Sequence, residues 1–492
     1  MFCSSASYID RTEWHKETMA ISPYELIFGI IGVYLRITGM KKVLIITYYW
    51  PPSGGSGVQR WLKFAKYLPE YGWEPVIYTP ENPEPNAVDT TLLKEIPQNL
   101  TVLKTKILEP YGIYKFLSGK KSDEKIEANI VAGKKSKSVA GSLFAFIRGN
   151  LFIPDPRCLW IRPSVRYLKK YLKENKIDAI ISTGPPHSMH LIAKRVSKKC
   201  GVKWIADFRD PWTGIFYFKH LKMSGFALKR HQKLERSVLE SAHRIIAVTE
   251  NMARDFSHHT QADKIKVVQN GYDPADFAQA PQIEQLPEYE AIKNKFLLLH
   301  TGIMADNGNP DVLWRVLGNL CRKDAKFRER LQIRSMGQVD RSVTEDVAKY
   351  GLQNNFIHSG YVPHSIIPTW QMAGDLLLLP LRKEPEAAGI LTGKFFEYLA
   401  AGGEIMAFGP PDGELAKALA DTAGGTIHEW NDEKGVEDAV LASYNRYCER
   451  VLKNPDYKRE NSRTKEIDTN RVKYSRKNLA GEMAGIMNEL LQ

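Results

Sequence analysis

Short apolar runs that end in glycine-containing loops constrain the fold of this chain more than any other feature. One run, Asp-Leu-Leu-Leu-Leu-Pro at residues 375–380, is too short for a buried helix and typical of a strand inside a parallel sheet. Beyond the following loop, Thr392 has the character of a helix N-cap, and Gly402 and Gly403 that of a helix end. The sequence therefore predicts a strand, a loop and a helix of about ten residues.

The start of this predicted helix suits a phosphate group. Free backbone N–H groups and the positive end of the helix dipole face outward there, and Lys394 lies in the first turn. Glu397 lies in the same turns, where its carboxylate can accept hydrogen bonds from sugar hydroxyls. An ordinary capped helix on an α/β sheet accounts for the same residues, because one glycine-rich turn is a weak signal. Both interpretations stay open on physical grounds.

A similar unit stands near the start of the chain. Residues 43–49 predict a strand that runs into Trp-Pro-Pro-Ser-Gly-Gly-Ser-Gly-Val-Gln-Arg at residues 50–60, and a helical pattern follows. Gly54, Gly55 and Gly57 allow close backbone approach at the carboxyl end of the strand, where open α/β sheets bind ligands. The spacing is neither the dinucleotide fingerprint nor a P-loop. A tight strand–helix turn is the alternative interpretation.

The stretch Thr-Gly-Lys-Phe-Phe-Glu-Tyr-Leu-Ala-Ala-Gly at residues 392–402 resembles the donor-site signature of the family 4 glycosyltransferases. These are retaining enzymes with the two-domain GT-B fold. The resemblance implies that Glu397 binds the ribose of a nucleotide-sugar, and that the turn and Lys394 hold its diphosphate. It runs from Met40 to about residue 430, with several motifs in the expected order.

The resemblance also implies a wider donor site built from both predicted sheets. The glycine loop would lie beside the donor diphosphate, and residues 356–364 would contact the base. The implied donor-binding residues besides Lys394 and Glu397 are Gly54, Gly55, Gly57, Gly302, Gly337, Tyr361, Arg382, Glu386, Gly389, Thr392 and Gly393.

The chain departs from the family at two positions. Many relatives carry a glutamate eight residues before the position of Glu397, but Gly389 stands here, and Glu386 is the substitute we expect. Relatives also carry an arginine after the first Thr-Gly of the second domain, whereas residues 305–310 contain none. Arg382 or Lys383 could supply that charge. Losing such a charge costs several kcal/mol of transition-state stabilisation, which makes weak activity an open outcome.

Two further loops predict an acceptor side. Residues 183–190, Thr-Gly-Pro-Pro-His-Ser-Met-His, place His187 and His190 after a predicted strand, where one of them could act as acid/base or orient the substrate. Helix capping by His187 and core packing of His190 are the alternatives. Residues 207–212, Asp-Phe-Arg-Asp-Pro-Trp, make Arg209 and Asp210 candidates for acceptor contacts or catalysis, against a purely structural salt-bridge corner.

The 492 residues are enough for two or three full-sized domains. We expect an α/β GT-B architecture: two Rossmann-like domains with parallel sheets, an interdomain cleft and a C-terminal crossover helix. The expected segments are an extension at 1–39, an acceptor-side domain at 40–277, a linker at 278–294, a nucleotide-sugar domain at 295–440 and C-terminal helices at 441–492.

The first 39 residues differ from the rest. Their apolar run, residues 26–35, is about half of the roughly 20 residues that span a bilayer. We expect Met40 to be the natural start, with a weak interfacial membrane anchor as the alternative. Residues 110–150 combine lysines with the apolar run 143–147. They suggest either a solvated loop beside a core helix or a surface that docks to anionic membrane.

Composition narrows the class of protein. A formal charge of +13 implies attraction to polyanions: nucleotide phosphates, anionic lipid or nucleic acid. No nucleic-acid recognition motif is evident, so nucleic acid ranks last. The five cysteines are scattered, which favours a reducing compartment and no structural metal.

We therefore expect a metal-independent retaining glycosyltransferase that needs no cofactor and moves a hexosyl-type group from a nucleoside-diphosphate sugar to a glycan or lipid-linked acceptor. Cell-surface polysaccharide synthesis is the expected setting, with the protein in the cytoplasm or peripheral at the inner membrane face. A catalytically impaired nucleotide-sugar- or glycan-binding relative is the first alternative. A sugar-nucleotide epimerase of the same fold is a poorer fit, because acid/base carboxylates are not evident.

Overall fold

The computed structural model describes residues 39–84, 88–109, 146–215, 218, 221, 223–453 and 469–492. The expected extension at 1–39 lies outside these residues except for Gly39, and so does the basic stretch 110–150 up to residue 145. None of the described helices is long and apolar enough to cross a membrane.

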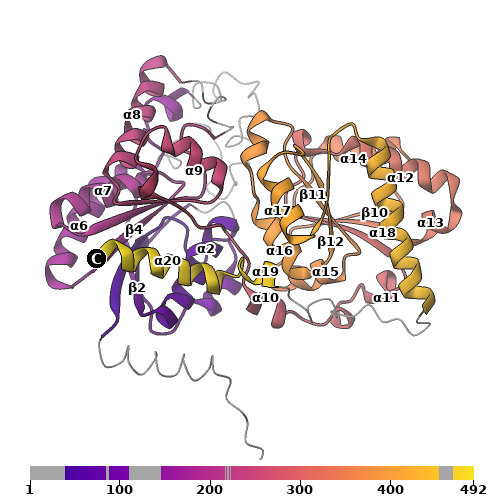
Figure 1. Cartoon of the computed structure of the whole chain (residues 1–492), viewed down its shortest axis with the longest axis horizontal. Coiled ribbons are helices and arrows are strands. Elements are labelled where there is room, and N and C mark those ends of the chain that lie inside the picture. Colours follow the sequence, from indigo (N-terminus) through magenta and orange to yellow (C-terminus); the bar gives the residue numbers. More distant parts are fainter. Residues whose placement is uncertain are drawn as a thin grey trace, which may run out of the picture. The chain divides into compact units, whose positions relative to one another are not determined.

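The first half of the chain builds a seven-stranded sheet in the order β3-β2-β1-β4-β5-β6-β7, and every neighbouring pair is parallel (Figure 1). Its strands are β1 Lys41–Ile46, β2 Trp73–Pro80, β3 Thr101–Thr105, β4 Ala179–Gly184, β5 Lys203–Phe208, β6 Arg244–Ala247 and β7 Ile265–Val267.

The second half builds a six-stranded sheet in the order β10-β9-β8-β11-β12-β13, again parallel throughout. Its strands are β8 Phe296–Thr301, β9 Leu331–Met336, β10 Phe356–Gly360, β11 Leu376–Pro380, β12 Glu404–Phe408 and β13 Gly425–His428. Two parallel-sheet domains with flanking helices confirm the predicted fold class.

Helices cover both faces of the first sheet, which is why its strands are apolar runs rather than alternating ones. Val43 and Ile45 face a core shared with α2 (Ser56–Tyr67) and α20 (Arg476–Leu491). Leu44 and Ile46 face a core built with helices on the other side. Those helices are α6 Ile161–Glu174, α7 Ser188–Cys200, α8 Gly225–Ser241 and α9 Glu250–Ser257.

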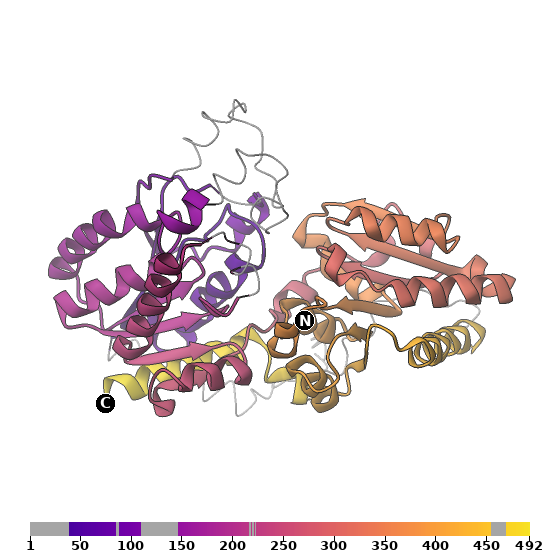
Figure 2. The same cartoon turned by 90° about the horizontal axis from the view of Figure 1, so that it is seen from above.

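The second sheet is covered in the same way, as the turned view also shows (Figure 2). Leu297 and Leu299 pack with α10 (Pro274–Ala278), α15 (Ile367–Ala373), α16 (Gly393–Ala401) and α17 (Glu414–Thr422). Phe296 and Leu298 pack with helices on the opposite face. These are α12 Asp311–Lys323, α13 Ala325–Arg330, α14 Arg341–Lys349 and α18 Glu433–Lys453.

Helix α20 completes the first domain from the far end of the sequence. Ala480, Met483 and Met487 are buried in the core beneath Val43 and Ile45, and the helix packs along α2. The short helix α19 (Thr469–Val472) precedes it. This is the crossover helix that the fold class implies.

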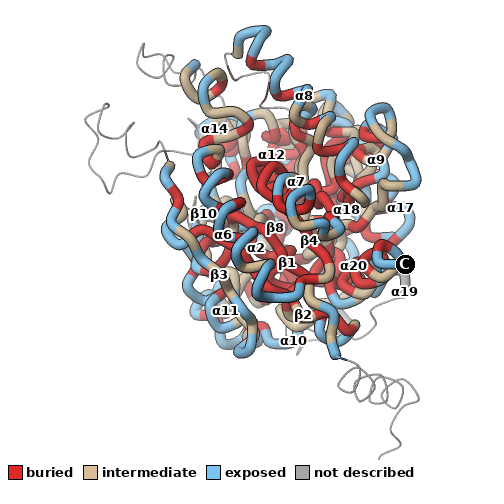
Figure 3. Tube along the Cα trace, turned by 90° about the vertical axis from the view of Figure 1, so that its left-hand side faces the viewer, coloured by how far each residue is buried: buried red, intermediate tan, exposed pale blue. Residues whose placement is uncertain are grey.

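One strand end differs from its sequence-based description. Strand β5 continues to Phe208, so Asp207 lies inside the sheet rather than after it. The expected linker 278–294 contains a 3-10 turn and the helix α11 (Tyr289–Ile292), and its Ile283 and Ile292 are fully buried. These two side chains need ordered packing, so this segment is folded. Buried residues fill the interior of both halves (Figure 3).

Candidate functional site

The helix α16 begins where the sequence predicts. Thr392 is its N-cap residue, with extended backbone, and Gly402 ends it at a left-handed φ of 72°. The Thr392 side chain makes no capping hydrogen bond, and its Oγ1 atom is buried without a partner among the described residues. The first N–H groups of α16 are therefore not occupied by a side-chain cap, which leaves them available for an anion.

Two glycines at the ends of neighbouring strands make room beside this helix start. Gly302 follows β8 with a φ of 116°, and Gly337 follows β9 with a φ of 124°, conformations that L side chains rarely adopt. Gly302 N donates to Met336 O at 2.6 Å. A Cβ atom on Gly302 would lie 2.7 Å from Lys394 Nζ. The ends of both strands and the first turn of α16 thus converge on Lys394.

Positive charge dominates this convergence. Burial lowers the pKa of Lys394, the Glu397 carboxylate opposes that shift, and the Arg382 guanidinium adds to it. Burial also lowers the pKa of Arg382. Burial, followed by the nearby Lys394 charge, lowers the pKa of His300 to about 4, so this imidazole is neutral. A buried ammonium with a guanidinium close by is stabilised by a bound anion.

Arg382 and Lys383 are the two candidates to supply the charge of the missing arginine, and the structure gives them different surroundings. Lys383 Nζ forms an ion pair with Asp311 at 3.1 Å and lies 4.8 Å from the ring centre of Trp430. Lys383 N also donates to Asn307 O at 2.7 Å, which fixes the 305–310 segment. The Arg382 charge, by contrast, acts directly on the pKa of Lys394, so Arg382 is the candidate that lies with Lys394.

Glu397 is held by a residue that the sequence analysis missed. Gln371, fully buried on α15, donates from Nε2 to Glu397 Oε2 and to Thr301 Oγ1, both at 3.1 Å. Tyr398 OH accepts from Thr301 N at 2.9 Å and closes the network. The one signal in the sequence was a glutamine inside the apolar segment 367–373.

The remaining predicted donor residues take varied positions. Glu386 lies in the first turn of a 3-10 helix, Pro385–Gly389, and Gly389 is its last residue. Tyr361 directly follows β10 and is 68% exposed. Gly393 is the first residue of α16, and a Cβ there would meet open space.

The glycine loop lies at the carboxyl end of β1 and opens α2. Gly55 is the N-cap of α2 with a φ of 93°, and no side chain caps this helix either; Gly54 precedes it. A Cβ on Gly57 would lie 2.8 Å from Arg209 Nη1 and 3.1 Å from the Tyr49 ring. The structure therefore brings Arg209 against the glycine loop, two features that lie far apart in the sequence.

Arg209 and Asp210 follow strand β5 side by side. Arg209 Nη2 donates to Pro185 O, in the loop that carries His187, while its Nε is buried without a partner among the described residues. Burial lowers the pKa of Arg209 and raises that of Asp210, and the Arg209 charge opposes the second shift. Asp207, by contrast, is fully buried and pairs with Arg60 at 2.9 Å. The interpretation as a structural salt bridge therefore applies to Asp207. Arg209 keeps an Nε without a partner among the described residues, so it can still contact a ligand at the loop.

His187 and His190 differ in their surroundings. His187 stacks on Trp212, with ring centres 4.7 Å apart and planes 2° apart. Both of its ring nitrogens are buried without a partner among the described residues, and burial holds its pKa well below the ordinary value. It lines a small cavity of about 70 Å³ together with Trp212, Pro185 and His231.

His190 is a fully buried core residue. Trp204 Nε1 donates to Ser182 Oγ at 2.9 Å, and Ser182 Oγ forms a second hydrogen bond with His190 Nδ1 at 2.8 Å. Burial lowers the pKa of His190 to about 3. His190 is therefore neutral, and its Nδ1 is already hydrogen-bonded to Ser182, in agreement with the core-packing interpretation.

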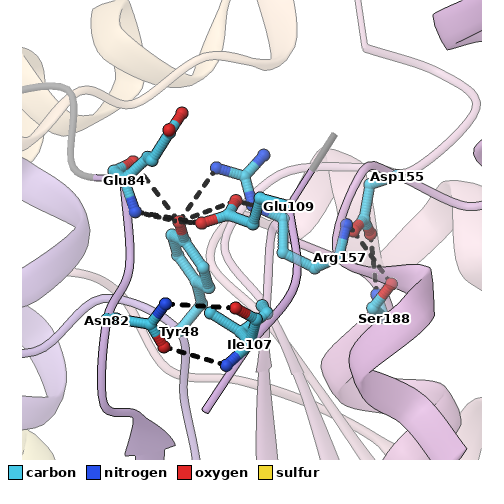
Figure 4. A network of polar contacts seen from close by, with 8 residues as sticks. All are labelled: Tyr48, Asn82, Glu84, Ile107, Glu109, Asp155, Arg157 and Ser188. Atoms are coloured by element: carbon cyan, nitrogen blue, oxygen red, sulfur yellow. Dashed lines mark hydrogen bonds and ion pairs between the residues drawn. The ribbon is translucent and has the colours of Figure 1, made fainter. Parts of the chain in front are cut away.

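The cap of α7 comes from another loop. His187 stands at the N-cap position, but its side chain makes no capping hydrogen bond. Asp155 instead accepts from Ser188 N and Ser188 Oγ, both at 2.8 Å (Figure 4). The helix-capping interpretation of His187 is therefore wrong, because the Asp155 carboxylate already fills that role and leaves the imidazole to the cavity.

A buried network, also missed from the sequence, fixes the loop of Asp155. Arg157 Nε pairs with Glu109 at 2.9 Å, and its Nη2 donates to Tyr48 OH at 3.1 Å (Figure 4). Glu84 N donates to Glu109 Oε2 at 2.9 Å. The carboxyl ends of β1, β2 and β3 are thereby tied to the loop that caps α7.

Among the described residues, no three His, Cys, Asp or Glu side chains lie together as metal ligands would. The site at the start of α16 contains backbone N–H groups, cations and glycines. Such a set can bind a diphosphate and stabilise negative charge.

Comparisons with known proteins agree on the fold, and a family model matches part of the chain. The model of Glycosyltransferase Family 4 matches residues 122–276. HepE from Anabaena, solved in complex with UDP, is similar with 13% identity and a TM-score of 0.56, covering 92% of this chain and 100% of HepE. No curated protein matches the sequence.

Two further solved structures are similar over nearly the whole chain. Sucrose-phosphate synthase from Thermosynechococcus elongatus has 13% identity and a TM-score of 0.56, covering 92% of this chain and 99% of that one. WaaG, a glycosyltransferase involved in lipopolysaccharide biosynthesis, has 16% identity and a TM-score of 0.51, covering 90% and 99%. At these identities the likeness concerns the fold.

Proposed function

We propose that this chain, which has the GT-B fold, is a family 4 glycosyltransferase. It transfers a hexosyl-type group from a nucleoside-diphosphate sugar to a glycan or lipid-linked acceptor, with retention of the anomeric configuration. The observation that carries the proposal is the meeting of Lys394, Gly302 and the uncapped start of α16 at one point. Cell-surface polysaccharide synthesis is the setting that we propose.

The donor diphosphate would lie at the N-terminus of α16. Backbone N–H groups and the helix dipole attract it, and Lys394 and Arg382 neutralise it. Gly302 and Gly337 let the backbone approach it closely, and the Glu397 carboxylate, oriented by Gln371, would accept the ribose hydroxyls. Because these groups stabilise the leaving diphosphate, the reaction as proposed needs neither a metal ion nor a cofactor.

The acceptor would approach from the first domain. Arg209 lies against the glycine loop with its Nε unpartnered among the described residues, and Asp210 is adjacent. The neutral His187, which lines the small cavity and whose ring nitrogens are buried without a partner among the described residues, would orient an acceptor hydroxyl. His190 would act only through the packing of this loop, since its Nδ1 is already engaged.

Calorimetric titration of the full chain with UDP and GDP, and with their sugars, tests the donor site. HepE is solved with UDP, which makes UDP the first nucleotide to try. We expect one nucleotide to bind and Glu397→Ala to weaken it about tenfold or more, corresponding to ~1.4 kcal/mol. Absence of binding by every nucleotide would overturn the proposal.

A non-catalytic binding protein is the second candidate, and a specific observation favours it. Gly389 offers no carboxylate to the transferred sugar, and the 305–310 segment offers no arginine to the diphosphate. Donor hydrolysis distinguishes the two candidates. UDP-sugar cleavage above background supports the enzyme, whereas nucleotide binding with cleavage at background supports the binding protein.

A further inference from the structure

Helix α8 presents an unusual exposed face. Phe226, in its first turn, is 76% exposed. Arg230 and Lys233 follow at helical spacing on the same side, with Lys229 and Arg236 beside them, and all four are exposed. The opposite side of α8 is buried against the first sheet, so this face is directed outward (Figure 3).

A second segment adds apolar surface at the same end of α8. Leu151 is 71% exposed, and Leu228 in the first turn of α8 is also exposed. Asn150 Oδ1 accepts from Ser224 N, the N-cap residue of α8, at 2.8 Å. This bond joins the two segments, so their apolar side chains gather near the start of the helix.

A groove of about 430 Å³ runs beside the basic side chains. Lys229, Lys233, Arg236 and His259 line it. Its one carboxylate, Glu235, is turned inward and accepts from the backbone N–H groups of Trp212 and Thr213 at 3.1 and 3.3 Å. The groove therefore presents cations outward and has room for a phosphate group.

The neighbouring helices carry charge of the same sign. Helix α6 packs against α7 and α7 against α8, on one side of the first sheet (Figure 1). Arg162, Lys169 and Lys173 on α6 and Arg195 and Lys199 on α7 are exposed. A broad basic surface thus surrounds the apolar side chains of α8.

We propose that α8, its groove and the adjoining Leu151 form a docking surface for a membrane that contains anionic lipids. Lys229, Lys233 and Arg236 contact lipid phosphates, and Phe226, Leu228 and Leu151 enter the boundary between head groups and acyl chains. A purely polyanionic partner would contact the basic residues but would leave the exposed phenylalanine among them in water. A lipid surface contacts both the basic and the apolar side chains, and this favours a membrane over a polyanion.

The docking surface is connected to the proposed acceptor side. Glu235 of α8 holds the backbone of Trp212, and Trp212 stacks on His187. Through this connection, docking would present a lipid-linked acceptor to the loop of His187, an inference that rests on the proposed function. The surface consists of described residues, whereas the membrane alternative in the sequence analysis concerned residues 110–150, of which 110–145 lie outside the described part of the chain.

Sedimentation of the full chain with vesicles tests the proposal. Vesicles of phosphatidylcholine alone are compared with vesicles that also contain phosphatidylglycerol, at low and high salt. We expect binding to the anionic vesicles only. The variant Lys229→Glu/Lys233→Glu/Arg236→Glu should bind at least about a hundredfold more weakly, since each basic residue near a membrane contributes roughly fivefold.

Phe226→Ser separates the two parts of the surface. We expect it to remove the part of vesicle binding that resists high salt, while the salt-sensitive part remains. The matched control, Lys326→Glu/Arg328→Glu/Lys349→Glu, reverses three exposed charges elsewhere and should bind vesicles almost as the parent does.

UDP titration of the same preparations keeps the docking surface distinct from the donor site. UDP binding that persists while the α8 variants lose vesicle binding supports the docking surface. UDP binding with no vesicle binding by the parent, equal losses in the control, or binding of RNA in place of vesicles would each overturn it. Failure of UDP binding alone contradicts the proposed function and leaves the docking surface intact.

Discussion

Gln371 Nε2 donates to Glu397 Oε2 at 3.1 Å, from a side chain that is fully buried on a neighbouring helix. Its other N–H is given to Thr301 Oγ1, so both amide hydrogens are used and the orientation of the amide is fixed. A carboxylate on a helix start would otherwise sample several rotamers. Gln371 selects one of them and thereby acts as a positioning residue.

Replacing Gln371 with methionine should therefore weaken UDP binding about tenfold, because a charge-assisted hydrogen bond of ~1.5 kcal/mol or more is lost. Binding of 2′,3′-dideoxy-UDP, which lacks the ribose hydroxyls, should change little. Titration of both nucleotides measures this difference. The control Gln332→Met places the same substitution at another buried glutamine of the second domain. Equal losses for both nucleotides would contradict the positioning role.

Lys394→Met should reduce UDP affinity by about 10- to 100-fold, since one charge-assisted contact to the diphosphate is removed. Arg382→Met should give a smaller loss in the same direction. Lys383→Met is the matched control, because its ammonium is already paired with Asp311. Titrations at low and high salt check the assignment. An effect of Lys383→Met as large as that of Lys394→Met would refute it.

Gly302→Ala should abolish UDP binding and lower the melting temperature. The new methyl group meets Lys394 and forces a backbone with a φ of 116° on an L residue. Gly485→Ala is the control in α20, where a Cβ meets nothing within 4 Å. That change should stabilise the protein by about 0.5–1 kcal/mol through its higher helix propensity. Thermal unfolding with and without UDP measures both effects.

Buried neutral histidines should make the protein sensitive to acid. Burial lowers the pKa of His190 to about 3 and of His231 and His300 to about 4, below the ordinary 6.5. Because the unfolded chain binds more protons between these values, stability is fully present above pH 6.5 and is lost as the pH falls below it. Each histidine costs about 2 kcal/mol by pH 5.

The melting temperature measured from pH 7.5 to 5 tests this expectation. His231→Gln, which keeps an acceptor for Trp212 Nε1, should show a shallower decline than the parent. A decline of equal steepness would mean that His231 does not titrate on unfolding.

The sequence predicted the sheets well because their strands are buried on both faces. Apolar runs such as residues 43–46 can lie nowhere else, and the start of α16 follows from local signals at Thr392 and Gly402. Asp207 was harder to interpret, because its partner Arg60 lies 147 positions earlier and the pairing depends on the packed fold.

The site was predictable only where chemistry is local in the sequence. Lys394 and Glu397 stand in one motif, whereas Gln371 reaches Glu397 from another helix through a contact that no spacing reveals. Arg382 and Lys383 are adjacent and equally basic. The fold separates their roles, because it pairs Lys383 with Asp311 and brings the Arg382 charge near Lys394. Long-range side-chain contacts therefore account for most of what the sequence could not supply.

Helix α20 has a consequence for how the protein is made. Val43 and Ile45 are among the first residues of the first sheet to leave the ribosome, yet Ala480, Met483 and Met487, which cover them, follow the whole second sheet in the sequence. During synthesis this apolar face is without part of its cover until the second domain has been translated. The nascent protein thus carries a region that chaperones can bind, and the first domain matures only after the second has been made.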